Sequence, residues 1–208
     1  MINNELDIRE EAKKHLANRY GGEFEFFSHY GVGYVDLSVD EMLFKRPGED
    51  NEILVVITKE EDELVYRDNY LAVKFKQETA EFVTKIGDEL LGEFTVFVTP
   101  PYVAQDTSIP LPESFDEYLE QFKPVIFGTI VIPVNGFTAE YVDKLAEGLL
   151  EAGLLADFRL IVVDDKDYAD VTLIIAETLL AERKHCISGV ISVYETKKSV
   201  SLRERGMR

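Results

Sequence analysis

The order of hydrophobic and polar residues predicts a long amphipathic helix that leads directly into a strand over residues 69–99. Large apolar residues recur at spacings of four and seven, as in a helix with one buried face. They are Leu71, Phe75, Phe82, Ile86 and Leu90. Asp68 or Asn69 can cap the first turn, and Gly92 suits the left-handed position after a last turn. Residues 94–99 then alternate with a period of two, which predicts a strand.

The residues before this helix predict a first helix and several strands. Ile8, Ala12 and Leu16 share one face of a helix over residues 5–19. Strands are expected at residues 23–29, 33–39 and 53–58, and residues 64–67 could add another short strand. Since residues 53–58 are almost wholly apolar, that strand is expected at the centre of a sheet. Residues 1–101 are therefore predicted to form one subdomain with the element order α-β-β-β-α-β.

The remaining residues predict a connector and a second subdomain. Residues 102–123 form a proline-punctuated connector with a short acidic helix near residues 115–122. A strand at 125–134 is expected next, then a helix that Thr138 caps and Gly153 ends. Strands at 158–163 and 187–194 enclose a segment that is β-rich at 171–175 but favours a helix up to residue 183. Residues 124–208 thus predict β-α-β-α-β with a basic tail.

Together these patterns predict an α+β fold of two small helix-on-sheet subdomains, each a two-layer sandwich. A chain of 208 residues can bury a core without a disulfide, and a single cysteine, Cys186, cannot form one internally. This is compatible with the cytoplasm, although a secreted or surface protein whose signal peptide had been removed would look the same. No apolar run approaches the length of a membrane span.

The net charge of −18 is concentrated in the first part of the chain. Residues 1–122 contain 27 acidic and 11 basic residues, whereas residues 123–208 contain 13 acidic and 11 basic residues. Such a surface repels nucleic acid and anionic membranes and favours a basic protein partner, although it also serves solubility alone. From residue 183 onward basic residues dominate, so the end of the chain could dock on an acidic body or fray.

Four aspartates after a strongly apolar strand form the main candidate for chemistry. Ligands and cations often bind at the carboxyl ends of strands, and carboxylates suit calcium or magnesium. The aspartates are Asp164, Asp165, Asp167 and Asp170. Their spacing is not that of an EF-hand loop, because the glycine and the distal glutamate are missing. Acidic residues that offset the dipole at a helix N-terminus explain the cluster equally simply, and that interpretation is favoured.

Other motifs of catalysis or cofactor binding are absent from the sequence. There is no HExxH, CxxC or GxSxG motif, and Gly31 and Gly33 fit a hairpin turn better than a phosphate-binding loop. Cys186 beside His185 is more typical of a packed thiol than of a nucleophile. The segments at residues 18–24 and 67–71 resemble segments of bacterial proteins, and this resemblance implies no family.

Three functions remain open from the sequence. The first is a non-enzymatic binding module whose acidic surface meets a basic protein partner. The second is a metal-assisted hydrolase that uses the aspartates at residues 164–170. The third is a self-associating structural protein whose basic tail docks on its acidic body. The missing catalytic motifs and the uneven charge favour the first, with no cofactor required.

Overall fold

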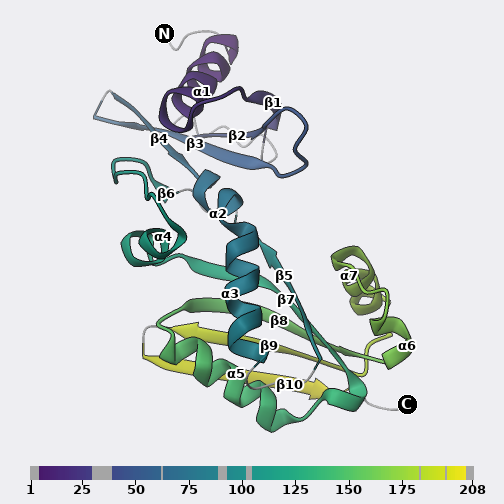
Figure 1. Cartoon of the computed structure of the whole chain (residues 1–208). Helices are drawn as coiled ribbons and strands as arrows, with labels where there is room; N and C mark the ends of the chain where they lie inside the picture. Colours follow the sequence, from purple (N-terminus) through teal and green to yellow (C-terminus); the bar gives the residue numbers. More distant parts are fainter. Residues whose placement is uncertain are drawn as a thin grey trace. The chain divides into compact units, whose positions relative to one another are not determined.

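The computed structural model describes seven stretches of the chain. They are residues 5–29, 39–61, 63–88, 93–101, 105–182, 184–194 and 196–204. Two five-stranded sheets with helices divide the chain into two compact units (Figure 1). Unit 1 comprises Met1–Lys74 and Pro101–Pro112, and unit 2 comprises Phe75–Pro100 and Glu113–Arg208. The predicted α+β fold with two helix-on-sheet subdomains is therefore confirmed.

Unit 1 is built on an antiparallel sheet with the strand order β1-β2-β3-β4-β6. The strands are β1 (Glu25–His29), β2 (Val39–Lys45), β3 (Ile53–Glu60), β4 (Glu63–Asp68) and the short β6 (Gln105–Asp106). β3 lies in the middle, as its apolar sequence predicted. The central position gives β3 a partner strand on both edges.

β2 was not predicted from the sequence. Met42, Leu43 and Phe44 are consecutive and all buried, so the strand lacks the alternation of buried and exposed residues that would reveal it. The strand predicted at residues 33–39 falls, except for Val39, outside the described residues. β2 pairs with β3 from Val39 opposite Thr58 onward.

Helix α1 (Glu5–Tyr20) supplies the helical layer of unit 1. Its predicted inner residues Ala12 and Leu16 are fully buried, in one cluster with Phe24, Phe44 and Val55. Burying a large apolar side chain contributes about 1.5 to 3 kcal/mol, far more than a surface ion pair. This apolar contact is therefore the main term that holds α1 on the sheet.

A buried carboxylate also joins α1 to β4. Asp68 is 1% exposed, and its Oδ2 lies 3.0 Å from Nε2 of His15. Its Oδ1 accepts a hydrogen bond of 2.7 Å from the Tyr20 hydroxyl and one of 3.0 Å from the Tyr70 backbone N–H. These contacts offset the cost of burying the charge. Asp68 thus connects residues of α1 to the start of helix α2 (Tyr70–Lys74).

Two tyrosines of unit 1 make its stability sensitive to alkaline pH. Burial, followed by the charge of Asp68, raises the pKa of Tyr20 above its usual value. Burial, followed by the hydrogen bond to Glu11, raises the pKa of Tyr66 to about 12. A raised folded-state pKa means that the native state retains protons that the unfolded state loses. The resulting stability is complete below the unfolded pKa near 10.0 and is lost as pH rises through the folded values.

We therefore expect the urea midpoint of unit 1 to fall steadily above about pH 10, and Tyr66→Phe to make that fall shallower. Urea unfolding at pH 8, 10 and 11, with absorbance of the phenolate as a second signal, measures both effects. Tyr194→Phe in unit 2 is the matched control and should leave the profile of unit 1 unchanged. A midpoint that is constant over this range would contradict the prediction.

The helix predicted over residues 69–92 is divided in two. Helix α2 ends at Lys74, and helix α3 (Lys76–Asp88) begins after Phe75. Leu71 and Val73 are buried in unit 1, whereas the Phe75 ring stacks on Tyr118 of unit 2 with centroids 5.0 Å apart. The apolar residues of the predicted helix are therefore divided between the cores of the two units. The predicted end at Gly92 lies outside the described residues.

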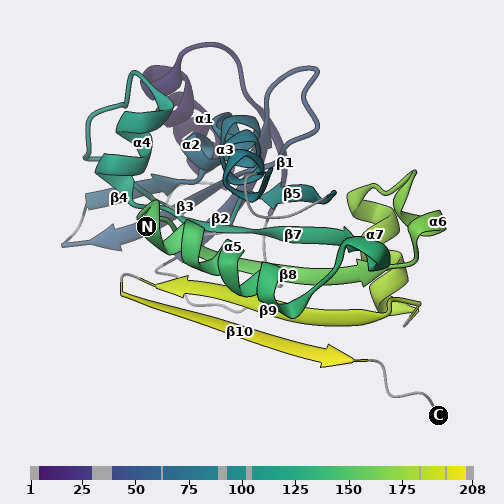
Figure 2. The same ribbon diagram turned by 60° about the horizontal axis from the view of Figure 1, so that its bottom comes forward.

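Unit 2 contains a mixed sheet with the strand order β10-β9-β8-β7-β5 (Figure 2). The strands are β5 (Thr95–Thr99), β7 (Val125–Pro133), β8 (Leu155–Val163), β9 (Ile187–Tyr194) and β10 (Lys197–Glu204). Among the described strand pairs of this sheet only β7–β8 is parallel, because helix α5 (Ala139–Glu151) returns the chain between these two strands. Thr138 caps α5 as predicted, accepting a hydrogen bond from the Tyr141 N–H at 3.2 Å.

The division of the chain differs from the predicted boundaries at 101 and 124. α3 and β5 precede residue 101, yet they belong to unit 2, where Thr95 to Thr99 pair with β7. Pro101–Pro112 returns to unit 1. A basic tail was expected at the end of the chain. Its described residues instead form strand β10, which pairs with β9. Strand pairing between distant segments, which periodicity does not encode, decides both points.

Helices cover both faces of the sheet in unit 2. Val83 of α3 and Leu145 of α5 belong to the core on one face, together with Ile130 of β7. Helices α6 (Asp165–Tyr168) and α7 (Leu173–Ala181) bury Tyr168 and Leu179 against the other face. The ambiguous residues 171–175 thus open a helix, which Thr172 caps by accepting from the Ile175 N–H. No helix within the described part of the chain is long and apolar enough to cross a membrane.

Candidate functional site

The four predicted metal-ligating aspartates lie at and after the end of β8. Asp165 accepts hydrogen bonds from the backbone and side chain of Asn135. Asp164 lies 3.6 Å from Cys186 Sγ through its Oδ1 and 4.0 Å from Lys166 Nζ through its Oδ2. Among the described residues no group of three or more acidic, histidine or cysteine side chains could hold a metal ion. The calcium or magnesium site at Asp164, Asp165, Asp167 and Asp170 stays a prediction.

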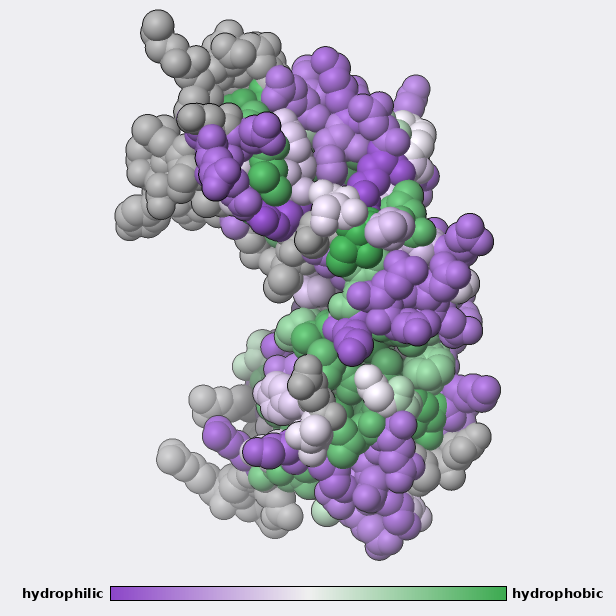
Figure 3. Space-filling view, turned by 90° about the vertical axis from the view of Figure 1, so that its left-hand side faces the viewer, coloured by the Kyte–Doolittle hydropathy of each residue, from purple (hydrophilic) through white to green (hydrophobic). Residues whose placement is uncertain are grey.

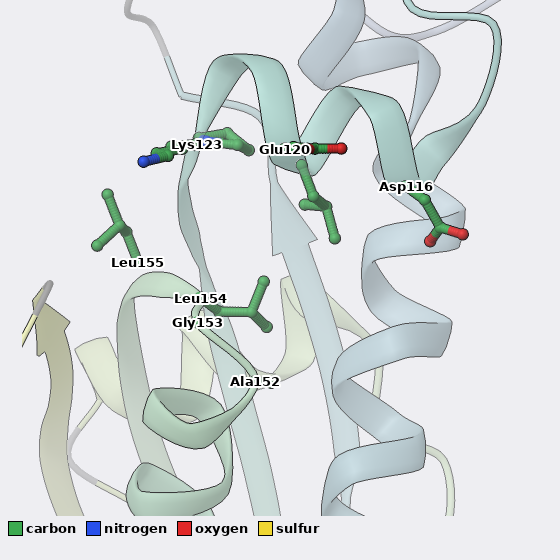
Figure 4. Close-up of a pocket in the computed structure, with 9 residues that line it drawn as sticks. Asp116, Glu120, Lys123, Ala152, Gly153, Leu154 and Leu155 are labelled. Carbon is green, nitrogen blue, oxygen red and sulfur yellow. The ribbon is translucent and has the colours of Figure 1, made fainter.

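A more distinct site is a groove of about 570 Å³ in unit 2, between helix α4 (Phe115–Phe122) and the turn from α5 to β8. Leucines form much of its wall, and charged residues of α4 stand along it (Figure 4). The lining residues are Asp116, Leu119, Glu120, Lys123, Pro124, Ala152, Gly153, Leu154 and Leu155. Figure 3 views this side of the chain and shows hydrophobic side chains exposed among hydrophilic ones in unit 2. The volume suits one or two side chains of a bound segment.

Local sequence explains why α4 begins and stays in place. The Ser114 hydroxyl accepts a hydrogen bond of 3.2 Å from the Glu117 N–H, and the Glu117 carboxylate accepts one of 2.7 Å from the Glu113 N–H. These contacts satisfy N–H groups that a helix start leaves free. Tyr118 of α4 is 2% exposed and packs on Phe75. The buried side of α4 is thereby anchored, which leaves Asp116 and Glu120 on the exposed side.

The opposite wall is the end of α5. The Ala152 N–H donates a hydrogen bond to the Gly148 carbonyl oxygen, and the Leu154 N–H donates one to the Leu149 carbonyl oxygen. Each N···O distance is 3.0 Å. Gly153 between them has φ +70, a left-handed conformation that glycine adopts without the usual steric cost. The turn carries the chain directly into β8, and Leu154 is only 5% exposed. Leu154 therefore forms a fixed apolar part of the groove.

The electrostatics of the groove favour a cation. Both α4 and α5 end at it, and each helix C-terminus carries a partial negative charge of about half an elementary unit. The exposed carboxylates of Asp116 and Glu120 add two full negative charges. Lys123 is the basic residue among the described residues that line the groove, and Figure 4 shows it on the side away from Asp116. The groove therefore combines an apolar wall with a negative rim.

The sequence contained each part of this groove but not their grouping. The acidic helix at residues 115–122 and the helix end at Gly153 were both predicted, yet they are about thirty residues apart. Nothing in a periodic pattern places two helix ends side by side. Comparison of the chain with protein-family models, with curated proteins and with solved structures gives no match.

Proposed function

We propose that this chain is a binding module that holds a basic segment of a protein partner in the groove between α4 and the turn from α5 to β8. The observation that supports the proposal is the convergence of two helix C-termini with the carboxylates of Asp116 and Glu120. This charge arrangement agrees with the net charge of −18, which favours basic partners over anionic ones.

An arginine next to a leucine fits the groove best. The aliphatic part of an arginine side chain can lie on Leu119 and Leu155, while its guanidinium reaches the carboxylates of the rim. A neighbouring leucine adds burial against Leu154. The planar guanidinium can engage a carboxylate through two hydrogen bonds, whereas a lysine ammonium acts as a point charge.

The test uses the full chain and a fluorescent nine-residue peptide with a central Leu-Arg pair. Fluorescence anisotropy measures its affinity beside a matched peptide in which neutral citrulline replaces arginine. We expect the arginine peptide to bind more tightly and to lose affinity as salt rises, because exposed charges are screened. The double variant Asp116→Asn, Glu120→Gln should weaken binding by about five- to tenfold. Lys123→Ala should strengthen it, since a competing cation is removed.

Glu177→Gln is the matched control, because this exposed acid lies on α7, outside the groove. Glu177→Gln removes one negative charge from the chain, as Asp116→Asn or Glu120→Gln does. It should leave the affinity for the arginine peptide unchanged. Equal binding of the citrulline peptide, or a loss of affinity in the control as large as in the groove variants, would refute the proposal.

A further inference from the structure

Strand β10 forms an edge of the sheet in unit 2 (Figure 2). It pairs with β9 over its full length of eight residues, from Lys197 opposite Tyr194 to Glu204 opposite Ile187, without a shift in register. Within the described residues no strand pairs with its other side. An edge strand presents a row of backbone N–H and C=O groups that another strand can pair with.

Most devices that protect an edge are missing from β10. The strand contains no proline and no bulge, and eight residues is longer than the usual five or six. The protecting features that remain are charged residues, and of these Lys197 near one end and Arg203 near the other lie on the exposed face of the strand. The edge is thus open to a strand that tolerates these two cations.

The two faces of β10 differ in character. Lys197, Ser199, Ser201 and Arg203 are exposed on one face. On the other face Val200 and Leu202 pack against the core, and Lys198 Nζ lies 3.1 Å from Asp143 Oδ2 of α5. Lys198 is therefore neutralised within the unit. Lys197 and Arg203 form no ion pair with another described residue.

Charge disfavours a second copy of this chain that is paired symmetrically about Val200 as the added strand. Consider two copies of β10 paired antiparallel and related by a two-fold axis, so that the two Val200 residues face each other. At each end of this pair, Lys197 of one copy would lie opposite Arg203 of the other. Like charges placed directly opposite destabilise a strand pair. A strand with acidic side chains at these two points would instead form favourable pairs at both ends.

We propose that the free edge of β10 binds an extended acidic segment of a protein partner by antiparallel strand addition. Seven partner residues span the distance from Arg203 to Lys197. The first and seventh are acidic, opposite Arg203 and Lys197, and the second and fourth are apolar, opposite Leu202 and Val200. Main-chain hydrogen bonds give this mode its affinity, and the alternating side chains give its specificity.

The test uses the full chain and a labelled peptide with glutamate at positions 1 and 7, valine at 2 and 4, and serine or threonine elsewhere. We expect this peptide to bind in an anisotropy assay and to slow amide hydrogen exchange in residues 197–204. The charge-reversed variant Lys197→Glu, Arg203→Glu should bind about tenfold more weakly and should prefer a peptide with lysine at positions 1 and 7. Lys85→Glu on α3, with the same change of charge per site, should leave the affinity unchanged.

A second peptide separates strand addition from simple charge attraction. It has the same sequence, but alternate backbone nitrogens are methylated on the edge that would pair, so its charge is unchanged while its hydrogen bonds are lost. We expect it not to bind. Equal binding of both peptides would overturn the proposal, as would no binding of the first. A free chain that sediments as a dimer through β10 would also overturn it, in favour of a second copy.

Discussion

Replacing Asp68 with alanine is expected to lower the free energy of unfolding of unit 1 by about 3 to 5 kcal/mol, because three groups lose the buried carboxylate that all of them contact. The carboxylate is almost completely buried and receives contacts from His15, the Tyr20 hydroxyl and the Tyr70 N–H. Without it these partly buried groups lose their shared acceptor, and each one left unpaired costs about 1 to 3 kcal/mol. The expected result is therefore a large loss of stability from a single polar residue.

Hydrogen exchange of residues 5–20 and 53–68 at increasing urea concentrations measures this loss within unit 1. A segment-resolved method is needed because a chain of two units need not unfold in one step. Asp40→Ala is the matched control, since Asp40 is exposed on β2 of the same unit. Tyr20→Phe removes one of the three contacts and should cost about 1 kcal/mol. A cost for Asp68→Ala no larger than that of Asp40→Ala would contradict the prediction.

Replacing Gly128 with alanine is expected to destabilise unit 2 by about 3 kcal/mol through overpacking. Gly128 lies in β7 between Val98 of β5 and Phe158 of β8. An added Cβ would collide with the carbonyl oxygen of Phe97 and lie 2.9 Å from Cε1 of Phe158. The carbonyl belongs to the backbone of a paired strand, so the ladder itself must shift to make room.

Exchange of residues 125–133 and 155–163 measures the effect of Gly128→Ala in unit 2. Gly136→Ala is the matched control, because the nearest atom to its added Cβ is 3.7 Å away, an ordinary contact. It should change stability by less than about 0.5 kcal/mol, as most surface substitutions do. If both alanine variants unfold at the same urea concentration, close backbone approach is not the reason for glycine at position 128.

The helices were predictable to the extent that their signals are local. Ala12 and Leu16 mark the inner face of α1, and Thr138 marks the start of α5. Each signal acts within one or two turns, where periodicity and capping depend on neighbouring residues alone. The single helix expected across Phe75 was wrong: Val73 of α2 packs in the core of unit 1, whereas Val83 of α3 packs in the core of unit 2.

The strands divide in the same way. β3 and β8 have apolar sequences, which indicate a buried strand whichever strands are its neighbours. Both strands were predicted. β2 and β10 were not, since β2 lacks alternation and the basic residues of β10 predict a tail. The alternation of Lys198, Val200 and Leu202 with polar residues is visible in β10, yet its strand character depends on β9 as a partner.

The candidate sites show what local signals leave out. The sequence drew attention to four neighbouring aspartates, because residues close in sequence are the only cluster it can reveal. The groove instead joins the end of α4 to the end of α5, and the edge of β10 exists only because the sheet stops there. Neither could be found without the pairing of distant strands.

By itself, the sequence of this protein determined its fold class, several of its helices with the Thr138 cap of α5, its most apolar strands and its net negative charge. These follow from side-chain chemistry and spacing over a few residues. Tertiary structure alone decided that α3 and β5 belong to unit 2, that residues 197–204 form an edge strand, and that two helix ends meet at one groove. These features depend on contacts between residues far apart in the chain, whose free energies no local pattern encodes.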